Sequence, residues 1–117
     1  MEYQNVIAEK LGISRESKEE RALIGSAFAY CSSVGIEFSN IENKALAFAN
    51  HILQLKTRLD QGTDFPEIES SITDQVPLKY RNLAVQLLNK LFPKFKIPYS
   101  EVVFVAIHLS VAAAETN

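Results

Sequence analysis

The chain has a single cysteine, two histidines and no apolar run long enough to cross a bilayer. Cys31 therefore has no partner for an internal disulfide, which is typical of a protein in a reducing cytosol. The longest apolar stretch, residues 102–114, is interrupted by His108 and Ser110 and is too short to span a membrane. Residues 1–5 contain neither the basic region nor the apolar run of a secretory signal peptide. These absences predict a cytoplasmic protein.

The chain also lacks a large excess of charge of either sign, since it contains 12 Lys and Arg residues and 14 Asp and Glu residues, and its net charge is −2. This balance gives no general attraction to DNA, RNA or an anionic membrane. The sequence has no Cys-x-x-Cys, no His-Glu-x-x-His and no glycine-rich phosphate loop. No Ser, Cys or Lys nucleophile lies beside a base in the sequence. We therefore expect no metal site, no cofactor and no catalytic turnover.

The 117 residues and an apolar fraction of 47% predict one folded domain, residues 17–117, preceded by an N-terminal arm, residues 1–16. A chain of this size buries roughly 65% of its unfolded surface, so its core needs no disulfide or metal. Useful period-two alternation is lacking, and glycine and proline fall between blocks of helical periodicity, which predicts an all-α fold. The last block is apolar nearly all round and should form the central, most buried helix of a five-helix bundle. The predicted helical segments are residues 17–35, 39–62, 66–72, 77–93 and 98–114.

His51 interrupts the most clearly amphipathic segment of the chain, at a position where a leucine would be buried without the cost of desolvating a polar ring. Lys44 and Arg58 lie seven residues to either side of it, on nearly the same helix face. A histidine flanked by two cations would accept an anion such as a phosphoryl group. Taken alone, however, this spacing favours an ordinary half-buried histidine beside two unrelated surface charges.

His108 interrupts the last segment and has apolar residues on the turns before and after it, which favours its neutral form. A buried imidazole needs a hydrogen-bond partner, and Glu101, two turns back, is the one local candidate. On its own, this placement favours a satisfied core histidine. We expect His108 to be mostly buried and His51 to be partly exposed. Three carboxylates fit favourable charges at helix starts: Glu67, Glu69 and Glu101.

Residues 7–14 are similar to the first helix and turn of a helix-turn-helix. The segment that follows, residues 15–20, is highly charged and ends in two glutamates, which would repel nucleic-acid phosphates. We therefore expect no direct nucleic-acid binding here, and interpret the arm as a docking or swapped segment.

Two sequence motifs resemble those of the PTS regulation domain (PRD) family. Phe-Ala-Asn-His-Ile at residues 48–52, with Arg58 and Gly62 behind it, resembles the first histidine motif of the family. Ile-Pro-Tyr-Ser-Glu-Val-Val-Phe-Val-Ala-Ile-His-Leu at residues 97–109 resembles the second and is the more specific, because its Ile-Pro opening, its glutamate and its His-Leu ending occur together. The resemblance covers residues 17–114 and includes four intervening positions: Tyr80, Arg81, Ala84 and Leu87.

Members of that family are compact five-helix bundles, usually dimeric, in bacterial antiterminators and activators of sugar operons. The sugar phosphotransferase system phosphorylates their histidines, which shifts dimer packing and controls the attached effector. The resemblance thus implies that His51 and His108 are phosphoryl acceptors and that Arg58 supports the phosphoryl group or the interface. Before the first histidine the family often has aspartate, where this chain has Asn50, which lacks the charge that raises histidine basicity.

We therefore expect a stand-alone, cytoplasmic, bacterial regulatory domain that forms a homodimer and receives phosphate from a phosphocarrier protein or a transporter component of that system. The added charge, about −1.5 to −2, would repack the dimer or a partner surface and so control transcription. His51 should react faster than His108, with Arg58 or Lys44 pairing with the phosphoryl group. Two alternatives are a partner-binding bundle without phosphorylation and a module that binds a small anionic ligand through His51, Lys44 and Arg58.

Overall fold

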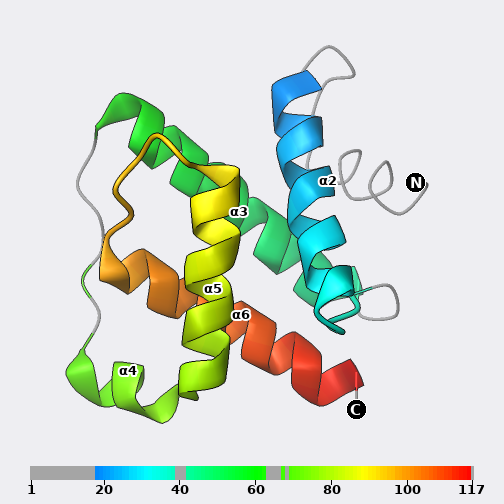
Figure 1. The fold of residues 1–117 in the computed structure, drawn as a ribbon, viewed down its shortest axis with the longest axis vertical. Helices are drawn as coiled ribbons and strands as arrows, with labels where there is room; N and C mark the ends of the chain where they lie inside the picture. Colours follow the sequence, from blue (N-terminus) through cyan, green and yellow to red (C-terminus); the bar gives the residue numbers. More distant parts are fainter. Residues whose placement is uncertain (1–17, 39–41, 63–66, 68, 117) are drawn as a thin grey trace.

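The computed structural model describes residues 18–38, 42–62, 67 and 69–116, and these residues form five α-helices and no strand (Figure 1). The predicted all-α, five-helix class is therefore confirmed. The N-terminal arm, the segment of residues 7–14 and the predicted helix starts at residues 17 and 39 lie outside the described residues. The helices are α2 (Lys18–Ser33), α3 (Glu42–Gln61), α4 (Ser70–Gln75), α5 (Leu78–Leu91) and α6 (Tyr99–Thr116).

Glycine and proline end or begin the long helices as the sequence predicts. Gly35 and Gly62 follow α2 and α3 with φ of 84° and 64°, in the left-handed region that glycine adopts without steric cost. Pro77 is the N-cap of α5, and the helix ends at Leu91, before Pro93. The positions of these breakers therefore set the bounds of three helices.

The short third helix is present, but its predicted bounds, residues 66–72, are shifted: α4 runs from Ser70 to Gln75, and the described residues Glu67 and Glu69 are not helical. Glu69 is extended, with φ −69° and ψ 142°, and its carbonyl accepts the N–H groups of Ile72 and Thr73. The prediction relied on a proline opening the first turn. The φ of proline is equally compatible with extended backbone, so that signal does not fix a helix start.

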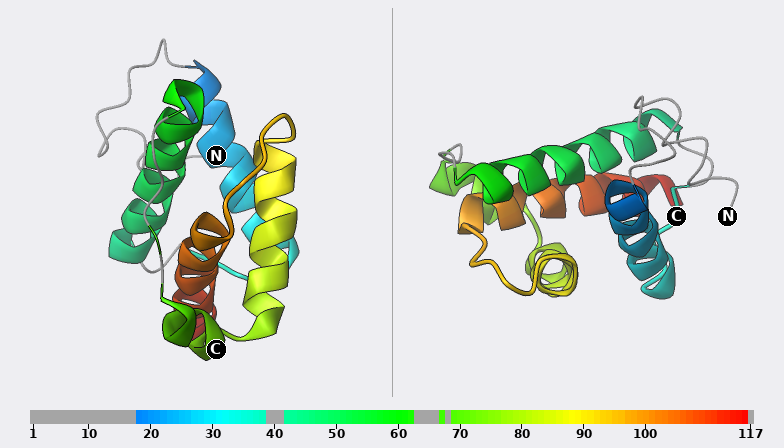
Figure 2. Two further views of the ribbon diagram at one scale, coloured as in Figure 1. Left: turned by 90° about the vertical axis from the view of Figure 1, so that its left-hand side faces the viewer. Right: turned by 90° about the horizontal axis from the view of Figure 1, so that it is seen from above.

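Helix α6 lies at the centre of the bundle. It packs against α3 on one side and against α5 on the other, and α2 packs against α3 and α5. Figure 2 shows α3 and α6 lying side by side and running in opposite directions. The antiparallel arrangement brings the second half of α3 next to the first turns of α6. None of the described helices is long and apolar enough to cross a membrane.

The core contains a buried aromatic cluster and the apolar face of α6. Phe28, Phe38 and Phe48 are buried, and their ring centroids lie 5.0–5.5 Å apart. Each such side chain stabilises the fold by about 1.5–3 kcal/mol through burial. Helix α6 buries a wide face, as predicted for the central helix, by placing these apolar residues in the core: Val102, Val103, Val105, Ala106, Leu109, Ala112 and Ala113.

One face of α6 is apolar but incompletely covered. Phe104 and Ile107 are half-buried, and Val111 is 41% exposed. Their spacing of three and four residues places them on one helix face. His108 adjoins this face and is also half-buried. We name Phe104, Ile107 and Val111 the apolar strip.

Candidate functional site

A fully buried carboxylate joins α6 to α3. The side chain of Glu101 is 0% exposed, and its Oε2 lies 3.1 Å from Nε2 of His51. Nη2 of Arg58 donates to both carboxylate oxygens, at 2.8 Å to Oε1 and 3.0 Å to Oε2. We name His51, Arg58 and Glu101 the ionic clamp. Because its members come from two helices, the clamp holds α3 and α6 in one relative position.

Helix periodicity explains why these three residues meet. His51 and Arg58 are seven residues apart, two turns of α3, and therefore share one face. Glu101 lies in the first turn of α6, where the unpaired backbone N–H groups favour a negative charge. Its own N–H is bonded to the carbonyl of Pro98 at 3.0 Å. The proline that opens α6 thus places the carboxylate opposite the cationic face of α3.

The Glu101 carboxyl is ionised at neutral pH. Burial by itself raises its pKa, but the hydrogen bond with His51 and the charge of Arg58 outweigh burial and hold the pKa below its ordinary value. A buried negative charge is tolerated because both oxygens are hydrogen-bonded and a cation is adjacent.

Arg58 is only partly satisfied. Among the described residues, its Nε is buried without any hydrogen-bond partner, because both bonds to Glu101 are made by Nη2. A buried unpaired donor costs about 1–3 kcal/mol relative to a bonded one. The guanidinium therefore retains a donor for a further acceptor that arrives nearby.

The second histidine lies directly beside the clamp. The ring centroids of His108 and His51 are 5.3 Å apart, and the ring of Phe48 lies 6.1 Å from His108. Burial, with a smaller contribution from the charge of His51, lowers the pKa of His108 from 6.5 to about 4, so His108 is neutral at neutral pH. The structure therefore brings together the two histidines that the sequence identified 57 residues apart.

Two expectations about the histidines need correction. Glu101 is not the partner of His108, because it bonds His51, and no described residue hydrogen-bonds the His108 ring. The expected contrast in burial is also weaker than predicted, since both histidines are half-buried and His51 is 17% exposed. The sequence indicated Glu101 as a helix-start charge and as the local candidate partner of His108, not as a partner of His51. The position of Glu101 within an apolar segment indicated that its carboxylate would be buried and would need a partner. Spacing within α6 could not show that this partner lies on α3.

The remaining predicted residues contribute less to this geometry. Asn50 is exposed, and the carboxylate beside His51 comes from Glu101 rather than from position 50. Lys44 is half-buried on α3. The predicted anion pocket of His51, Lys44 and Arg58 is already partly filled in the structure, because the Arg58 guanidinium binds the Glu101 carboxylate.

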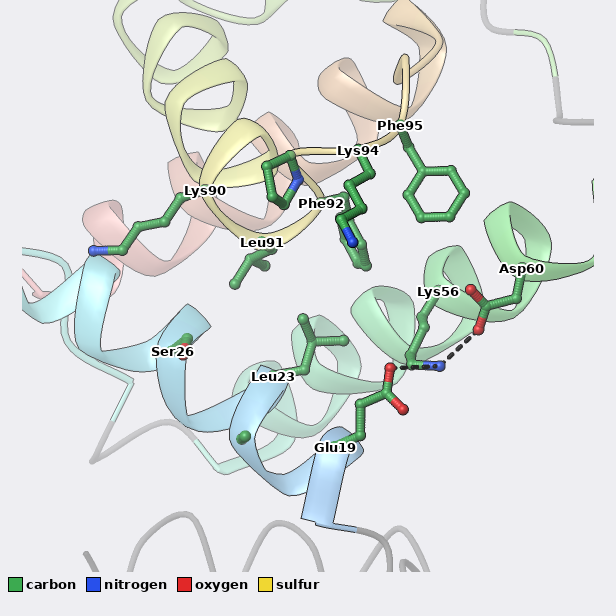
Figure 3. A pocket seen from close by; sticks show the side chains of 12 residues that line it. Glu19, Leu23, Ser26, Lys56, Asp60, Lys90, Leu91, Phe92, Lys94 and Phe95 are labelled. Atoms are coloured by element: carbon green, nitrogen blue, oxygen red, sulfur yellow. Dashed lines mark hydrogen bonds and ion pairs between the residues drawn. The ribbon is translucent and has the colours of Figure 1, made fainter.

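A cavity of about 420 Å³ lies between α2, α3 and the α5–α6 connection (Figure 3). Leu23 and Leu91 face each other across it, and Lys56 contacts Asp60 at 2.6 Å and Glu19 at 3.6 Å. We name Glu19, Lys56 and Asp60 the surface triad. Helix α3 turns about 100° per residue, so Lys56 and Asp60 lie on the side of α3 opposite His51 and Arg58.

Among the described residues, no three His, Cys, Asp or Glu side chains converge as a metal site would require. No protein-family model matches the chain, and no curated protein or solved structure is significantly similar to it. The arrangement of side chains is therefore the basis for any statement about function. It consists of two neighbouring imidazoles, one of them bonded to a buried, arginine-paired carboxylate that links two helices.

Proposed function

We propose that this chain is a phosphorylation-controlled regulatory bundle, similar to a PTS regulation domain, that accepts a phosphoryl group on His51 with His108 as a second acceptor. The supporting observation is the ionic clamp, which couples the ring of His51 to the packing of α3 on α6. Histidine nitrogens are competent phosphoryl acceptors, and an arginine beside the acceptor binds phosphoryl oxygens well. In this proposal the chain receives the phosphoryl group but does not itself catalyse a reaction.

The charge of a phosphoryl group explains how modification would change the bundle. A phosphohistidine brings about −1.5 to −2 charge next to the buried Glu101 carboxylate. The two anions repel each other and compete for Arg58, whose Nε has no hydrogen-bond partner among the described residues of the unmodified protein. Movement of Arg58 toward the phosphoryl group leaves Glu101 buried without its cation. The α3–α6 contact is then destabilised and the bundle repacks.

The apolar strip supplies a surface that this repacking can control. It lies on α6, and Phe104 within it has its ring centroid 6.0 Å from that of His51. Three apolar residues that are incompletely covered on the central helix of a small bundle fit a homodimer interface. We propose that phosphorylation beside this strip changes the dimer equilibrium and, through it, the activity of a transcriptional effector in the bacterial cytoplasm.

Proximity of the two histidines predicts one phosphoryl group per chain at a time. With ring centroids 5.3 Å apart, two phosphoryl dianions would repel strongly in this partly buried setting. His51 carries the adjacent arginine and reacts first. His108 reacts when His51 is removed, or more slowly.

The test is phosphotransfer from the phosphorylated phosphocarrier protein to wild type, His51→Ala and His108→Ala, with intact mass measured without acid. We expect one phosphoryl group on wild type and on His108→Ala, and slow or no labelling of His51→Ala. Asn50→Asp is the control, and because Asn50 is exposed and Glu101 supplies the carboxylate, its labelling should match wild type. Labelling that survives in His51→Ala and disappears in His108→Ala would reverse the order of the sites. Absence of label on every variant would contradict the proposal.

The dimer is tested by sedimentation at tens of micromolar, an order of magnitude chosen for a modest dimer affinity. Wild type should sediment as a dimer, and Val111→Glu should shift it to monomer because a charge enters the apolar strip. The control Ile72→Glu changes an exposed apolar residue on α4 instead and should leave the dimer intact. A monomer in wild type at this concentration would exclude the dimer.

The cavity favours a second candidate function, a partner-binding or ligand-binding bundle without phosphorylation. Its volume is in the range of small-ligand sites, and its lining combines apolar side chains with Lys90 and Lys94. A rise in melting temperature with sugar phosphates that survives in His51→Ala and is lost in Lys94→Glu would favour this candidate.

A further inference from the structure

The ring of His51 is held through only one of its two nitrogens. Nε2 lies 3.1 Å from the Glu101 carboxylate, and no described residue hydrogen-bonds Nδ1. Among the described residues, Nε of Arg58 is the side-chain nitrogen or oxygen that is both fully buried and without a hydrogen bond. Nδ1 of His51 also lacks a hydrogen bond but does not belong to this fully buried class. Nδ1 is therefore accessible to solvent, in keeping with the 17% exposure of the side chain.

The state of Glu101 decides which nitrogen of His51 carries the proton. The carboxylate is ionised, because the Arg58 guanidinium bonds both of its oxygens and His51 lies beside it. An ionised carboxylate can only accept hydrogen bonds, so the proton in this contact belongs to Nε2. A neutral imidazole has one N–H, and Nδ1 consequently carries the free electron pair.

We infer that Nδ1 of His51 is the atom that receives the phosphoryl group, and that Glu101 is the positioning residue that directs the group to Nδ1. The inference rests on the proposed role of His51 as a phosphoryl acceptor, and it adds the position of attachment and the residue that selects it. Arg58 contributes indirectly by keeping Glu101 charged.

The transfer balances without any additional reactant. The electron pair of Nδ1 forms a bond to phosphorus while the donor's N–P bond breaks, and that bond's electron pair returns to the donor nitrogen, which takes up a proton from solvent water. The His51 ring keeps its proton on Nε2 and becomes an imidazolium as the Nδ1–P bond forms. The developing positive charge lies 3.1 Å from the Glu101 carboxylate, which stabilises it.

The proton position is tested first, without any phosphoryl donor. His108→Ala leaves His51 as the one histidine of the chain, so ¹⁵N-histidine labelling and long-range ¹H–¹⁵N correlation report on it directly. In the neutral ring we expect a protonated Nε2 and an unprotonated Nδ1. The opposite tautomer would overturn the inference.

The position of attachment is tested with potassium phosphoramidate, a small donor that releases ammonia and needs no carrier protein. On His108→Ala, ³¹P and ¹⁵N spectra should show the phosphoryl group on Nδ1. In Glu101→Gln/His108→Ala the neutral amide no longer dictates the tautomer, and the ratio of Nδ1 to Nε2 product should fall about tenfold, as expected for loss of one charge-assisted hydrogen bond. Glu69→Gln/His108→Ala, which changes an exposed carboxylate at another helix start, should keep the parent ratio.

The outcomes separate this inference from the proposed function. Label on Nδ1 from phosphoramidate together with no transfer from the phosphocarrier would contradict the proposed function and leave the assignment of Nδ1 standing. Label on Nε2 in the presence of Glu101, from either donor, would contradict the assignment of Nδ1. A helical far-ultraviolet spectrum for Glu101→Gln shows that its ratio is measured on a folded bundle. If that variant does not fold, the tautomer and the product in His108→Ala decide the question.

Discussion

Helix α3 carries two ionic networks on opposite faces, and they differ chiefly in their contact with water. In the ionic clamp, Arg58 bonds a carboxylate, Glu101, that is 0% exposed. In the surface triad, Lys56 contacts two carboxylates, Asp60 and Glu19, that are 50% and 83% exposed. Water screens the second network and solvates each member when a partner is lost. In the ionic clamp, water cannot replace a lost partner of the buried Glu101 carboxylate, so removing one member destabilises the others.

This difference locates the part of the bundle that a change in charge can switch. Adding or removing one charge at the triad alters a solvated surface. Adding or removing one charge at the clamp leaves another charge buried without compensation, which costs several kcal/mol. A regulatory modification would therefore act strongly at the clamp and weakly at the triad.

The largest effect is expected from Arg58→Met, which removes the cation and leaves the buried Glu101 carboxylate. We expect the free energy of unfolding to fall by about 3–5 kcal/mol, as for other broken buried ion pairs. Urea unfolding at pH 7 measures it. The double variant Arg58→Met/Glu101→Leu removes both charges and should recover most of the loss. A loss below about 1 kcal/mol in the single variant would mean that the clamp is already hydrated.

Glu101→Gln should have a smaller effect that depends on pH. At pH 7 we expect a loss of about 1–3 kcal/mol, because a charged acceptor bonded on both oxygens becomes a neutral amide. The folded pKa of Glu101 lies below its ordinary value of 4.5, so the carboxylate stabilises the fold above pH 4.5, and this contribution disappears as the pH falls through the folded pKa. The difference between variant and wild type should therefore narrow in acid. Equal differences at pH 7 and in acid would contradict the assignment.

His108 should make the wild type sensitive to mild acid. Its pKa is lowered from 6.5 to about 4 in the folded state, so the unfolded chain binds the proton more readily between these values. Stability should therefore fall as the pH is lowered from 6.5 toward 4, by at most about 1.4 kcal/mol per pH unit from this group. In His108→Leu the slope between pH 6.5 and 4.5 should be smaller, as measured by urea midpoints. An unchanged slope would assign the acid sensitivity to another group.

The smallest effect is expected from Lys56→Met, the matched partner of Arg58→Met on the same helix. Because the surface triad is solvated, we expect a loss of no more than about 0.5–1 kcal/mol. In high salt the loss should shrink further, since screening acts on exposed pairs. The ratio of the two losses, measured side by side with and without salt, sharpens the comparison between the two faces. Equal losses for Arg58→Met and Lys56→Met would remove the distinction.

Local patterns predicted the helices well. On α3, the expected apolar stripe is buried at each of its described positions: Ala45, Phe48, Ile52, Leu55 and Leu59. The same periodicity placed His51 and Arg58 on one face, as the clamp requires. The least accurate bounds were those of α4, a helix of six residues with none of them buried. A helix this short has little periodicity, and one proline could not locate its start.

The candidate site was predicted only in part, because it depends on contacts between distant segments. Spacing identified the two histidines and the arginine, but not the bond between His51 and Glu101, which are 50 residues apart. It assigned Glu101 to His108 because both lie on the same helix. In the structure, the antiparallel crossing of α3 and α6 turns Glu101 toward α3, and no pattern within either helix encodes that pairing.

The sequence by itself determined the fold class, the approximate bounds of the long helices and the faces that become buried, because periodicity and helix breakers act over a few residues. Tertiary structure alone decided that Glu101 is buried against Arg58 and His51, and that His108 lies beside them. The physical reason is that the free energy of a charged side chain depends on its solvation and on the charges beside it, and both are set by tertiary packing. The same glutamate is a solvated helix-start charge at the surface and the centre of an interhelical clamp when α3 packs over it.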